Sequence, residues 1–455
     1  MTYGVPDSKA FPPSYHIVGI AGAGMSALAQ VLIAQGFRVS GSDRYLDSGR
    51  RLIVLEKLKD LGVELVPQNG NGINPQISAV VISSAIEQDN PDLIAANRLE
   101  VPVIHRAEML AQLVSGNTLI AVTGTSGKTT VTGMLGWILE QTGRDPTVVN
   151  GGVVLNWLSE RVIGNVRMGS SRLWVVELDE SDKSLLKFYP DFAVITNISK
   201  DHFELAEVKN LFKRFSYQVK GPVIGCFDND DYNAALHDAQ LQVSASECKF
   251  QYKGVAFSLS LPGRHNAENA LQTVMLCEQL GLELAAVNKA FKGFKGIQRR
   301  LERVGDVNGI AVIDDYAHNP AKITAAYQAV APFFKRIFAI WQPHGFKPLA
   351  LMSGELLDVF AGIIRESDRV YILPAYFAGG TVERLVSSEL FVERLQKRHV
   401  PASYVPSYSA LLPRILNEVS NGDAVLFMGA RDPAIPVIAR RFTAELQNFL
   451  MNGMA

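Results

Sequence analysis

The residues best suited to chemistry form a phosphate-binding loop in the middle of the chain. Residues 122–130 read Val-Thr-Gly-Thr-Ser-Gly-Lys-Thr-Thr, between an apolar run at 118–122 and an amphipathic run at 131–141. A strand, a glycine loop and a helix in succession direct backbone N–H groups at one point, where a triphosphate fits. Lys128 can reach the terminal phosphates, and the Thr129 hydroxyl can bind Mg²⁺. The candidate nucleotide-binding residues are Gly124, Thr125, Ser126, Gly127, Lys128, Thr129 and Thr130.

This loop departs from the commonest consensus at one position. The form G-x-x-x-x-G-K-[ST] has glycine where this chain has Val122. A glycine-rich turn that binds nothing is the alternative interpretation.

A second glycine loop lies near the N-terminus. Residues 19–24 read Gly-Ile-Ala-Gly-Ala-Gly, after an apolar strand and before a helix. Such a loop brings a diphosphate to a helix N-terminus, and an acidic residue about 20 positions on, here Asp43, is typical of a ribose contact. NAD is the simplest ligand, but a nucleotide-sugar diphosphate fits the same geometry, and so does a tight turn without a ligand.

Acidic residues follow two later apolar strands. Residues 177–182 read Glu-Leu-Asp-Glu-Ser-Asp, and Asp201 and His202 follow the next strand. The carboxyl ends of parallel strands beside a phosphate loop are where α/β sheets bind ligands. Glu177 and His202 are therefore candidates for one Mg²⁺, while Thr129 and phosphate oxygens would hold another. A solvated acidic loop is the alternative.

Polar residues further along the chain fit the rest of a nucleotide. Asn266 and Asn269 share one face of a predicted helix, and their amides match the donors and acceptors of a purine edge, although they equally suit helix capping. Arg300 can neutralise a phosphoryl group, and Asp315 can accept from ribose hydroxyls. A surface ion pair is the alternative for Arg300.

Alternating strand-like and helix-like runs predict parallel sheets covered by helices. Expected strands include 16–20, 79–83, 173–177, 192–197, 310–313, 336–341, 369–373 and 424–428, and expected helices include 25–35, 51–61, 107–113, 266–280 and 321–330. The fold class is α/β in three domains: a Rossmann-like domain at 1–114, a central phosphate-loop domain at 115–300 and a second Rossmann-like domain at 301–455.

Bulk properties exclude several classes of protein. The 455 residues are 47% hydrophobic and carry 44 basic against 45 acidic side chains, so no strong field favours nucleic acid. The three cysteines have no close spacing, which argues against a disulfide framework or structural zinc. Without an apolar leader or a run of about 20 apolar residues, we expect a cytoplasmic protein outside the membrane, a monomer or homodimer.

Taken together, the motifs resemble the Mur ligase family, the ATP-dependent amide-forming enzymes of peptidoglycan precursor synthesis. The resemblance covers nearly the whole chain, and its segments are GIAGAGMSALA, VSGSD, VVISSAIEQDNPDL, VPVIHRAEMLAQL, VTGTSGKTT, ELDESD, TNISKDHFEL, GRHNAENAL, GIQRRLERV, DDYAHNP and WQPH. The N-terminal half is most similar to the members that join L-alanine to UDP-N-acetylmuramate. Members that attach a ready-made tripeptide to the same sugar during recycling are the nearest alternative.

The resemblance implies roles for these residues. The first glycine loop would bind the UDP-sugar rather than NAD, through Gly22, Ala23, Gly24, Met25, Ser26, Asp43 and Ser84. Lys128 and Thr129 would bind ATP phosphates and Mg²⁺, Glu177 and His202 the metals, and Asn266 and Asn269 the adenine. Arg300 would bind a phosphate and Asp315 the ribose, and His318 would lie where the third domain closes on the others.

The implied reaction activates a carboxylate. ATP phosphorylates the lactyl carboxylate of the muramic acid, and an amine then attacks the acyl phosphate to form an amide. The resemblance thus implies ATP with two Mg²⁺ ions, UDP-N-acetylmuramate and an amino acid or peptide. Lys128 and Arg300 suit the neutralisation of charge that this reaction needs.

The chain departs from the L-alanine and tripeptide members at three positions. They typically carry His at Ser126, a second His at Asn319, and Arg-Tyr where this chain has Gly345-Phe346. The acceptor is therefore less well indicated than the reaction with ATP, and another amino acid remains an alternative. An NAD-dependent oxidoreductase and a catalytically silent nucleotide-binding regulator are the readings from other classes.

Overall fold

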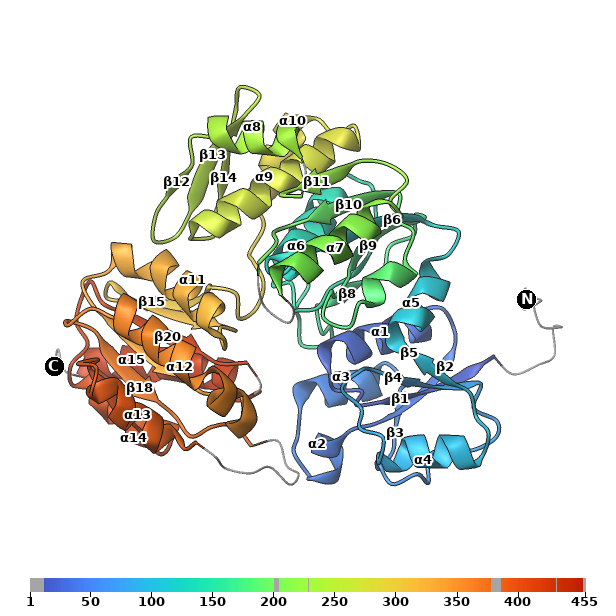
Figure 1. Cartoon of the computed structure of the whole chain (residues 1–455), viewed down its shortest axis with the longest axis horizontal. Coiled ribbons are helices and arrows are strands. Elements are labelled where there is room, and N and C mark those ends of the chain that lie inside the picture. Colours follow the sequence, from blue (N-terminus) through green and yellow to red (C-terminus); the bar gives the residue numbers. More distant parts are fainter. Residues whose placement is uncertain (1–11, 200–203, 228, 378–385, 431, 453–455) are drawn as a thin grey trace. The chain divides into compact units, whose positions relative to one another are not determined.

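The structure is a computed structural model, which describes residues 12–199, 204–227, 229–377, 386–430 and 432–452. It is an α/β protein of four sheets (Figure 1). The chain forms two compact units. The first comprises Met1–Gln240, Phe250–Ser258 and Glu268–Lys295, and the second Leu241–Lys249, Leu259–Ala267 and Gly296–Ala455.

The first sheet is parallel throughout and has the strand order β3-β2-β1-β4-β5. Its strands are β1 (Ser14–Val18), β2 (Arg38–Ser42), β3 (Glu64–Leu65), β4 (Ala79–Ile82) and β5 (Val103–His105). Its helices are α1 (Ala23–Ala34), α2 (Arg44–Asp47), α3 (Ile53–Asp60), α4 (Pro91–Arg98) and α5 (Arg106–Val114). The strand order reverses at β1, so the first glycine loop, which follows β1, lies at the switch point where such sheets bind ligands.

A buried polar cluster ties the centre of this sheet to α4. Asp92 of α4 has no exposed side-chain surface and accepts hydrogen bonds from the Ser42 hydroxyl and the Gly70 amide, and His16 Nε2 lies 3.4 Å away. Burial raises the pKa of Asp92, but the hydrogen bonds from His16, Ser42 and Gly70 outweigh it, so the pKa is lowered. The carboxylate therefore holds two strands and a loop together.

The second sheet, of order β11-β10-β6-β9-β7-β8, is parallel except for β8, which pairs antiparallel with β7. Its strands are β6 (Thr118–Thr123), β7 (Thr147–Val149), β8 (Val166–Arg167), β9 (Leu173–Glu177), β10 (Phe192–Ile195) and β11 (Val223–Gly225). The helices are α6 (Lys128–Gln141), the 3-10 turn η1 (Ser184–Lys187) and α7 (Leu205–Ser216). The strand that leads to the phosphate loop, β6, lies between β10 and β9, so the residues after all three strands meet at one edge.

A three-stranded sheet of order β12-β13-β14, with β12 antiparallel to β13, follows the second sheet along the chain. The elements of this region are α8 (Asp230–Asp238), β12 (Gln242–Val243), β13 (Cys248–Tyr252), β14 (Val255–Leu259), α9 (Arg264–Gln279) and α10 (Leu284–Phe291). The boundary between the two compact units passes through this region.

The last sheet, of order β15-β16-β20-β17-β18-β19, is parallel except for its edge strand β15. Its strands are β15 (Glu302–Val307), β16 (Ile310–Asp315), β17 (Ile337–Trp341), β18 (Arg369–Ile372), β19 (Ala402–Tyr404) and β20 (Ala424–Met428). The helices are α11 (Pro320–Val330), η2 (Ala331–Phe333), α12 (Phe346–Ile363), α13 (Ser388–Gln396), α14 (Tyr408–Leu416) and α15 (Ile435–Asn452).

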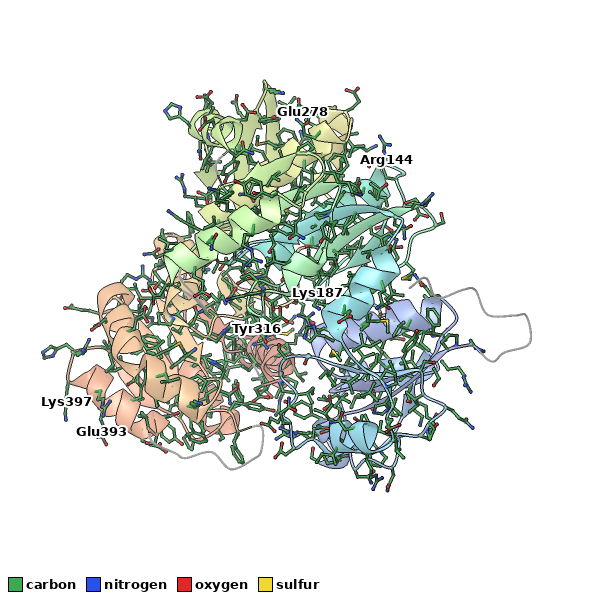
Figure 2. All side chains as sticks on the ribbon, turned by 45° about the vertical axis from the view of Figure 1, so that its right-hand side comes forward. Arg144, Lys187, Glu278, Tyr316, Glu393 and Lys397 are labelled. Atoms are coloured by element: carbon green, nitrogen blue, oxygen red, sulfur yellow. The ribbon has the colours of Figure 1, made fainter. Side chains whose placement is uncertain are left out.

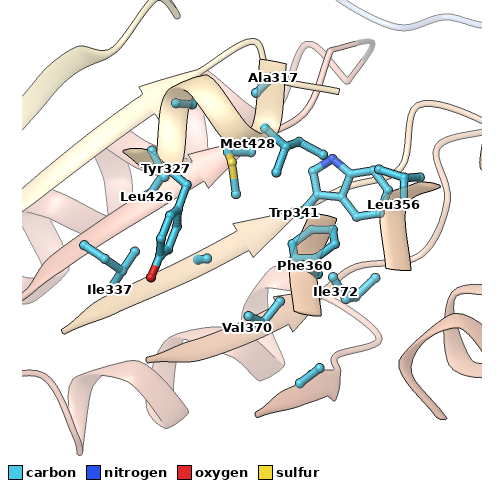
Figure 3. Close-up of a cluster of buried hydrophobic side chains, with 14 of the residues drawn as sticks. Ala317, Tyr327, Ile337, Trp341, Leu356, Phe360, Val370, Ile372, Leu426 and Met428 are labelled. Carbon is cyan, nitrogen blue, oxygen red and sulfur yellow. The ribbon is translucent and has the colours of Figure 1, made fainter. Parts of the chain in front are cut away.

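One face of this sheet packs on a large apolar cluster. Trp341 at the end of β17 lies beside Phe360 of α12, with ring centroids 5.5 Å apart, and Ile372 and Met428 complete the contact region (Figure 3). Burial of such aromatic side chains is the main stabilising contribution at this kind of core. None of the helices in the described part of the chain has the length and apolar content needed to cross a bilayer.

Candidate active site

Two glycines let the phosphate loop bend tightly against its neighbours. Gly124 has a φ of +131° and Gly127, the N-cap of α6, a φ of +85°, both of which L side chains rarely adopt. A β-carbon on Gly127 would lie 2.6 Å from Oδ1 of Asn269 in α9. The structure therefore brings the predicted Asn269, 5% exposed, directly against the phosphate loop.

Contacts from the two residues that follow β10 hold the middle of the loop. The Ser126 amide donates to Asn197 Oδ1 over 2.9 Å, and the Thr196 hydroxyl donates to the Ser126 carbonyl. The Thr125 amide donates to the Asn197 carbonyl over 3.1 Å. The backbone of Ser126 is thus fixed by its neighbours.

Lys128 begins α6 and is held by two acceptors. Its Nζ donates to the Gly124 carbonyl over 2.7 Å and to Glu180 Oε2 over 2.5 Å. Burial lowers the pKa of Lys128, but the carboxylates of Glu180, Asp179 and Glu177 outweigh it and raise the pKa. The lysine is therefore a fixed positive charge.

Thr129 and Glu177 meet at the same edge of the sheet. The Thr129 hydroxyl donates to Glu177 Oε1 over 3.1 Å, and the Gly151 amide donates to Glu177 Oε2 over 2.7 Å. A β-carbon on Gly151 would lie 2.7 Å from both carboxylate oxygens, so this approach requires glycine. The third predicted metal ligand, His202, lies outside the described residues. In the described part of the chain, no cluster of three His, Cys, Asp or Glu residues could hold a metal by itself.

The other carboxylates after β9 face the start of α5. Asp179 Oδ2 lies 3.9 Å from Arg106, and Asp182 Oδ2 lies 3.6 Å from His105. Glu108 of α5 also pairs with Lys187, labelled in Figure 2, over 3.4 Å. The acidic segment therefore connects the phosphate-loop sheet to the first sheet, rather than forming a solvated loop.

A pocket of about 310 Å³ lies where these elements meet. It is lined by Gly22, Ala23, Gly24, Met25, Ala27, Leu28, Ser83, Arg106, Leu110, Val149, Asn150, Gly151, Glu177 and Asp179. Four predicted UDP-sugar residues and one predicted metal ligand thus share a single pocket. The sequence prediction named Ser84, but the neighbouring Ser83 lines the pocket and Ser84 is exposed.

Two predicted UDP-sugar residues shape the glycine loop instead of lining the pocket. Asp43 accepts hydrogen bonds from the amides of Ala21 and Tyr45, each over 2.9 Å, and burial raises its pKa. The Ser26 hydroxyl donates to the Ala23 carbonyl over 3.0 Å. Both side chains therefore fix the loop that would meet the ligand.

Sequence reasoning missed three polar residues. Arg106 lies beside the glycine loop, since a β-carbon on Gly24 would be 2.9 Å from its guanidinium. Asn150 donates to the Thr129 carbonyl over 3.2 Å, and its buried Oδ1 has no hydrogen-bond partner among the described residues. Asn165 donates to the Ala23 carbonyl over 3.0 Å. Two of them had a local signal: Asn150 begins an Asn-Gly-Gly run directly after a strand, and Arg106 lies in the segment VPVIHRAEMLAQL.

The amide of Asn266, the second predicted adenine contact, is engaged at the start of α9. Its Nδ2 donates to the Pro262 carbonyl over 2.7 Å, and the residue is 4% exposed. This contact supports the local role that the sequence left open beside purine binding.

In the second unit, the predicted residues gather around β16. Asp315 accepts from the amides of Leu301 and Ala317, each over 2.8 Å, so its carboxylate fixes the chain entering the sheet. The Arg300 guanidinium lies 5.1 Å from the ring centroid of Tyr316, which is labelled in Figure 2. His318 also packs against Tyr316, and their ring centroids lie 5.6 Å apart.

His318 also contacts His344, which lies in the WQPH segment. Its ring centroid lies 4.8 Å from that of His344. Burial, together with the positive charges of Lys322 and other neighbours, lowers the pKa of His318 to about 3. The histidine is therefore neutral at physiological pH.

Asn319 and Gly345 have local structural roles. Asn319 is the N-cap of α11, because its Oδ1 accepts from the Lys322 amide over 2.9 Å. Gly345 precedes α12 with a φ of +155°, a conformation available to glycine. Asn319 thus stabilises the start of α11, and Gly345 permits the backbone conformation that precedes α12.

Family models match all three regions of the chain. The model described as "Mur ligase family, catalytic domain" matches residues 14–118, "Mur ligase middle domain" matches residues 122–213, and "Mur ligase, glutamate ligase domain" matches residues 299–431. The predicted three-domain α/β fold class is confirmed by these matches and by the parallel sheets.

Individual relatives agree with the family models. The chain is 37% identical to a UDP-N-acetylmuramate--L-alanine ligase of Synechococcus sp. (strain JA-2-3B'a(2-13)), over 95% of this chain and 93% of the relative. It is 36% identical to the ligase of the same name from Thermosynechococcus vestitus, over 91% of this chain and 92% of the relative.

Solved structures show the same fold. The UDP-N-acetylmuramate-alanine ligase of Thermotoga maritima matches with a TM-score of 0.76 and 27% identity, covering 96% of this chain and 99% of that one. A murein peptide ligase of Psychrobacter arcticus matches in fold with a TM-score of 0.65 and 22% identity, over 96% and 99% of the two chains. Because the sequence, the three matched regions and the fold agree along its length, the chain belongs to the Mur ligase family.

Proposed function

We propose that this protein is the ATP-dependent ligase that joins L-alanine to UDP-N-acetylmuramate during peptidoglycan precursor synthesis. The observation that carries the proposal is the shared pocket, in which the first glycine loop and Glu177 face one another. A sugar diphosphate held by the loop would extend toward the phosphate-loop sheet. The relatives that match over most of the chain carry the name of this activity.

The first glycine loop is proposed to bind the diphosphate of the UDP-sugar. Gly22, Ala23, Gly24 and Met25 line the pocket at the start of α1, where backbone N–H groups and the helix dipole favour an anion. Arg106 adds the one cationic side chain of the pocket lining. Asp43 and Ser26 would support this site by holding the loop, and Ser84 is proposed at its margin.

ATP is proposed to bind along the second glycine loop. Residues 124–130 would surround its phosphates, with Lys128 as the charge that meets the terminal groups. Asn269 lies against Gly127, and we propose that it and Asn266 contact the base. Arg300, Asp315 and His318 are proposed as the contribution of the second unit to the bound nucleotide and acceptor.

The residues present fit a magnesium ion that binds together with ATP. Thr129 Oγ1 and Glu177 Oε1 lie 3.1 Å apart and offer the oxygen ligands that Mg²⁺ prefers, while phosphate oxygens and water complete its coordination. His202 is proposed as a further ligand for a second ion. When bound, the metal would neutralise charge on the transferring phosphoryl group.

The proposed reaction proceeds in two displacements. A lactyl carboxylate oxygen attacks the terminal phosphorus of ATP, the bond to the bridging oxygen breaks, and ADP leaves. The amine of L-alanine then attacks the carbonyl carbon of the acyl phosphate, loses a proton, and expels phosphate to leave an amide. Lys128 would stabilise the charge that develops on the phosphoryl oxygens. ATP, UDP-N-acetylmuramate and L-alanine are substrates of the cytoplasm, where we propose that the enzyme acts.

The experiment that tests this function measures ADP release by the purified protein with ATP, Mg²⁺ and UDP-N-acetylmuramate. L-alanine, glycine, L-serine and the recycling tripeptide serve as alternative acceptors, and mass spectrometry identifies the product. We expect turnover with L-alanine and a product heavier than the UDP-sugar by one alanyl residue. If only the tripeptide supports turnover, the protein has the recycling activity instead. If none of the four acceptors supports turnover, the proposal is overturned.

A further inference from the structure

One carboxylate of the acidic segment has no place in the proposed reaction. Glu180 is 3% exposed, and its Oε2 accepts a hydrogen bond from Lys128 Nζ over 2.5 Å. The other carboxylates of this segment face different partners: Glu177 faces Thr129, Asp179 faces Arg106 and Asp182 faces His105.

This ion pair is costly for the protein to maintain. The two side chains are only 14% and 4% exposed, so both charges have lost most of their hydration. The attraction within a buried pair often only offsets that loss, which makes fold stability a weak reason for keeping it. The pair also involves the lysine that a phosphate loop uses to meet its nucleotide.

The Glu180 carboxylate is an anion held against the loop from within the protein. Lys128 begins α6 and also donates to the Gly124 carbonyl, so its ammonium is held against the phosphate loop. The carboxylate therefore supplies the negative charge that a terminal phosphate would supply there. Two anions close to one ammonium repel each other, because the buried site screens their charges poorly.

We propose that Glu180 is a positioning residue that restrains Lys128 until ATP binds, and that Lys128 exchanges the carboxylate for the terminal phosphates. This inference rests on the proposed use of ATP and adds a resting contact to it. While the nucleotide is absent, Glu180 keeps the lysine compensated and ordered. When the nucleotide arrives, it must compete with an internal anion, so Glu180 weakens ATP binding.

The test measures nucleotide binding by isothermal titration calorimetry in the presence of Mg²⁺ and without the sugar substrate. Glu180→Gln keeps the shape of the side chain and removes its charge, which leaves Lys128 without its ion-pair partner. We expect E180Q to bind ATP about tenfold more tightly, since the phosphates then restore the missing charge. AMP, which lacks the terminal phosphates, should bind to E180Q and wild type alike.

Two further variants separate this effect from a general disturbance. In a Lys128→Met background, E180Q should give a smaller gain in ATP affinity, because the exchange through the lysine is gone and only direct repulsion between the carboxylate and the phosphates is relieved. Glu207→Gln removes the carboxylate of the exposed Lys183 pair in the same unit and should have no effect. Glu180→Asp retracts the charge by one methylene and should give a smaller gain, which keeps the test available if E180Q folds poorly.

The outcomes are distinguishable. Weaker ATP binding in E180Q, an equal change for AMP, or the same gain without Lys128 would overturn the inference. Unchanged ATP affinity in E180Q would also overturn it while leaving the ligase proposal intact. A wild-type protein that binds no ATP would instead overturn the proposed function.

Discussion

Asn165, which precedes β8 in the phosphate-loop sheet, donates a hydrogen bond to the carbonyl of Ala23, the first residue of α1. It also accepts from Gln30 Nε2 over 2.8 Å, and it is 2% exposed. The backbone of the same residue accepts from the Asn150 amide over 2.9 Å. The glycine loop of one sheet is therefore attached to the wall of the proposed ATP site in the other.

Replacement of Asn165 should impair the sugar site more than the ATP site. Asn165→Ala removes the buried hydrogen bonds that join this residue to the Ala23 carbonyl and to Gln30 of α1, at a cost of about 1 to 3 kcal/mol. We expect the KM for UDP-N-acetylmuramate to rise about tenfold or more, with the KM for ATP nearly unchanged. Steady-state ADP release with each substrate varied in turn measures both. Equal changes in the two KM values would contradict this role.

Lys128→Ala should abolish turnover without unfolding the protein. The lysine supplies the positive charge nearest the proposed phosphoryl transfer, and removal of one such group typically lowers kcat by about 100-fold to 1000-fold. The circular dichroism spectrum should match that of wild type. A regulator without catalytic activity would show no basal ATP turnover for this substitution to remove.

Gly127→Ala and Gly143→Ala form a matched pair. Both glycines have positive φ, +85° and +74°, so both substitutions carry a similar backbone cost of about 1 to 2 kcal/mol. A β-carbon at Gly127 would meet Asn269 Oδ1 at 2.6 Å, while one at Gly143 would meet nothing within 4 Å. Thermal unfolding should shift in both, but ATP binding should be lost only in Gly127→Ala. Loss of binding in both would show that backbone strain is responsible.

Asp92→Asn should destabilise the first unit strongly. The side chain is fully buried, and its carboxylate serves His16, Ser42 and Gly70 together. Removal of one partner of a buried charged cluster costs about 3 to 5 kcal/mol, which urea unfolding measures directly. Asp89→Asn, an exposed neighbour, is the control and should change stability little. A small change in Asp92→Asn would contradict this role of the carboxylate.

Stability should fall in mild acid because His318 is buried in its neutral form. Its pKa is lowered to about 3 in the folded protein, against about 6.5 in an unfolded chain. Between those values only the unfolded state binds the proton, so stability is full above about pH 6.5 and decreases as the pH falls toward 3. His318→Gln should remove about 1 to 2 kcal/mol of the loss between pH 7.5 and 5. His237→Gln, at an 88% exposed histidine, should leave the pH dependence as it is.

The parts of the fold with a strong local signal could be predicted from the sequence. The expected strands at 173–177 and 424–428 coincide with β9 and β20, and the phosphate loop lies between β6 and α6 as predicted. Apolar runs and glycine spacing encode these features within a few residues. The three short strands β12 to β14 were missed, since two to five residues of alternating character give little signal.

Short sequence motifs predicted only some of the residues at the candidate site. Glu177 and Asn269 were found because each lies in a short motif, and both lie at the phosphate loop. Arg106 and Asn165 were missed because their partners are Asp179 and Ala23, far along the chain. Such pairs depend on how two sheets pack together, which no single segment encodes. The predicted roles of individual residues in binding substrates stay predictions.

Asn319 constrains how this enzyme could change its substrate. Because its side chain caps α11, replacement by histidine would weaken the start of that helix by about 1 kcal/mol before any effect on an acceptor. An experiment that places a histidine beside His318 therefore combines the loss of the helix cap and any change in acceptor binding in one measurement. A substitution that stabilises α11 elsewhere would have to come first, so the order of mutations along any evolutionary or engineered route is restricted at this position.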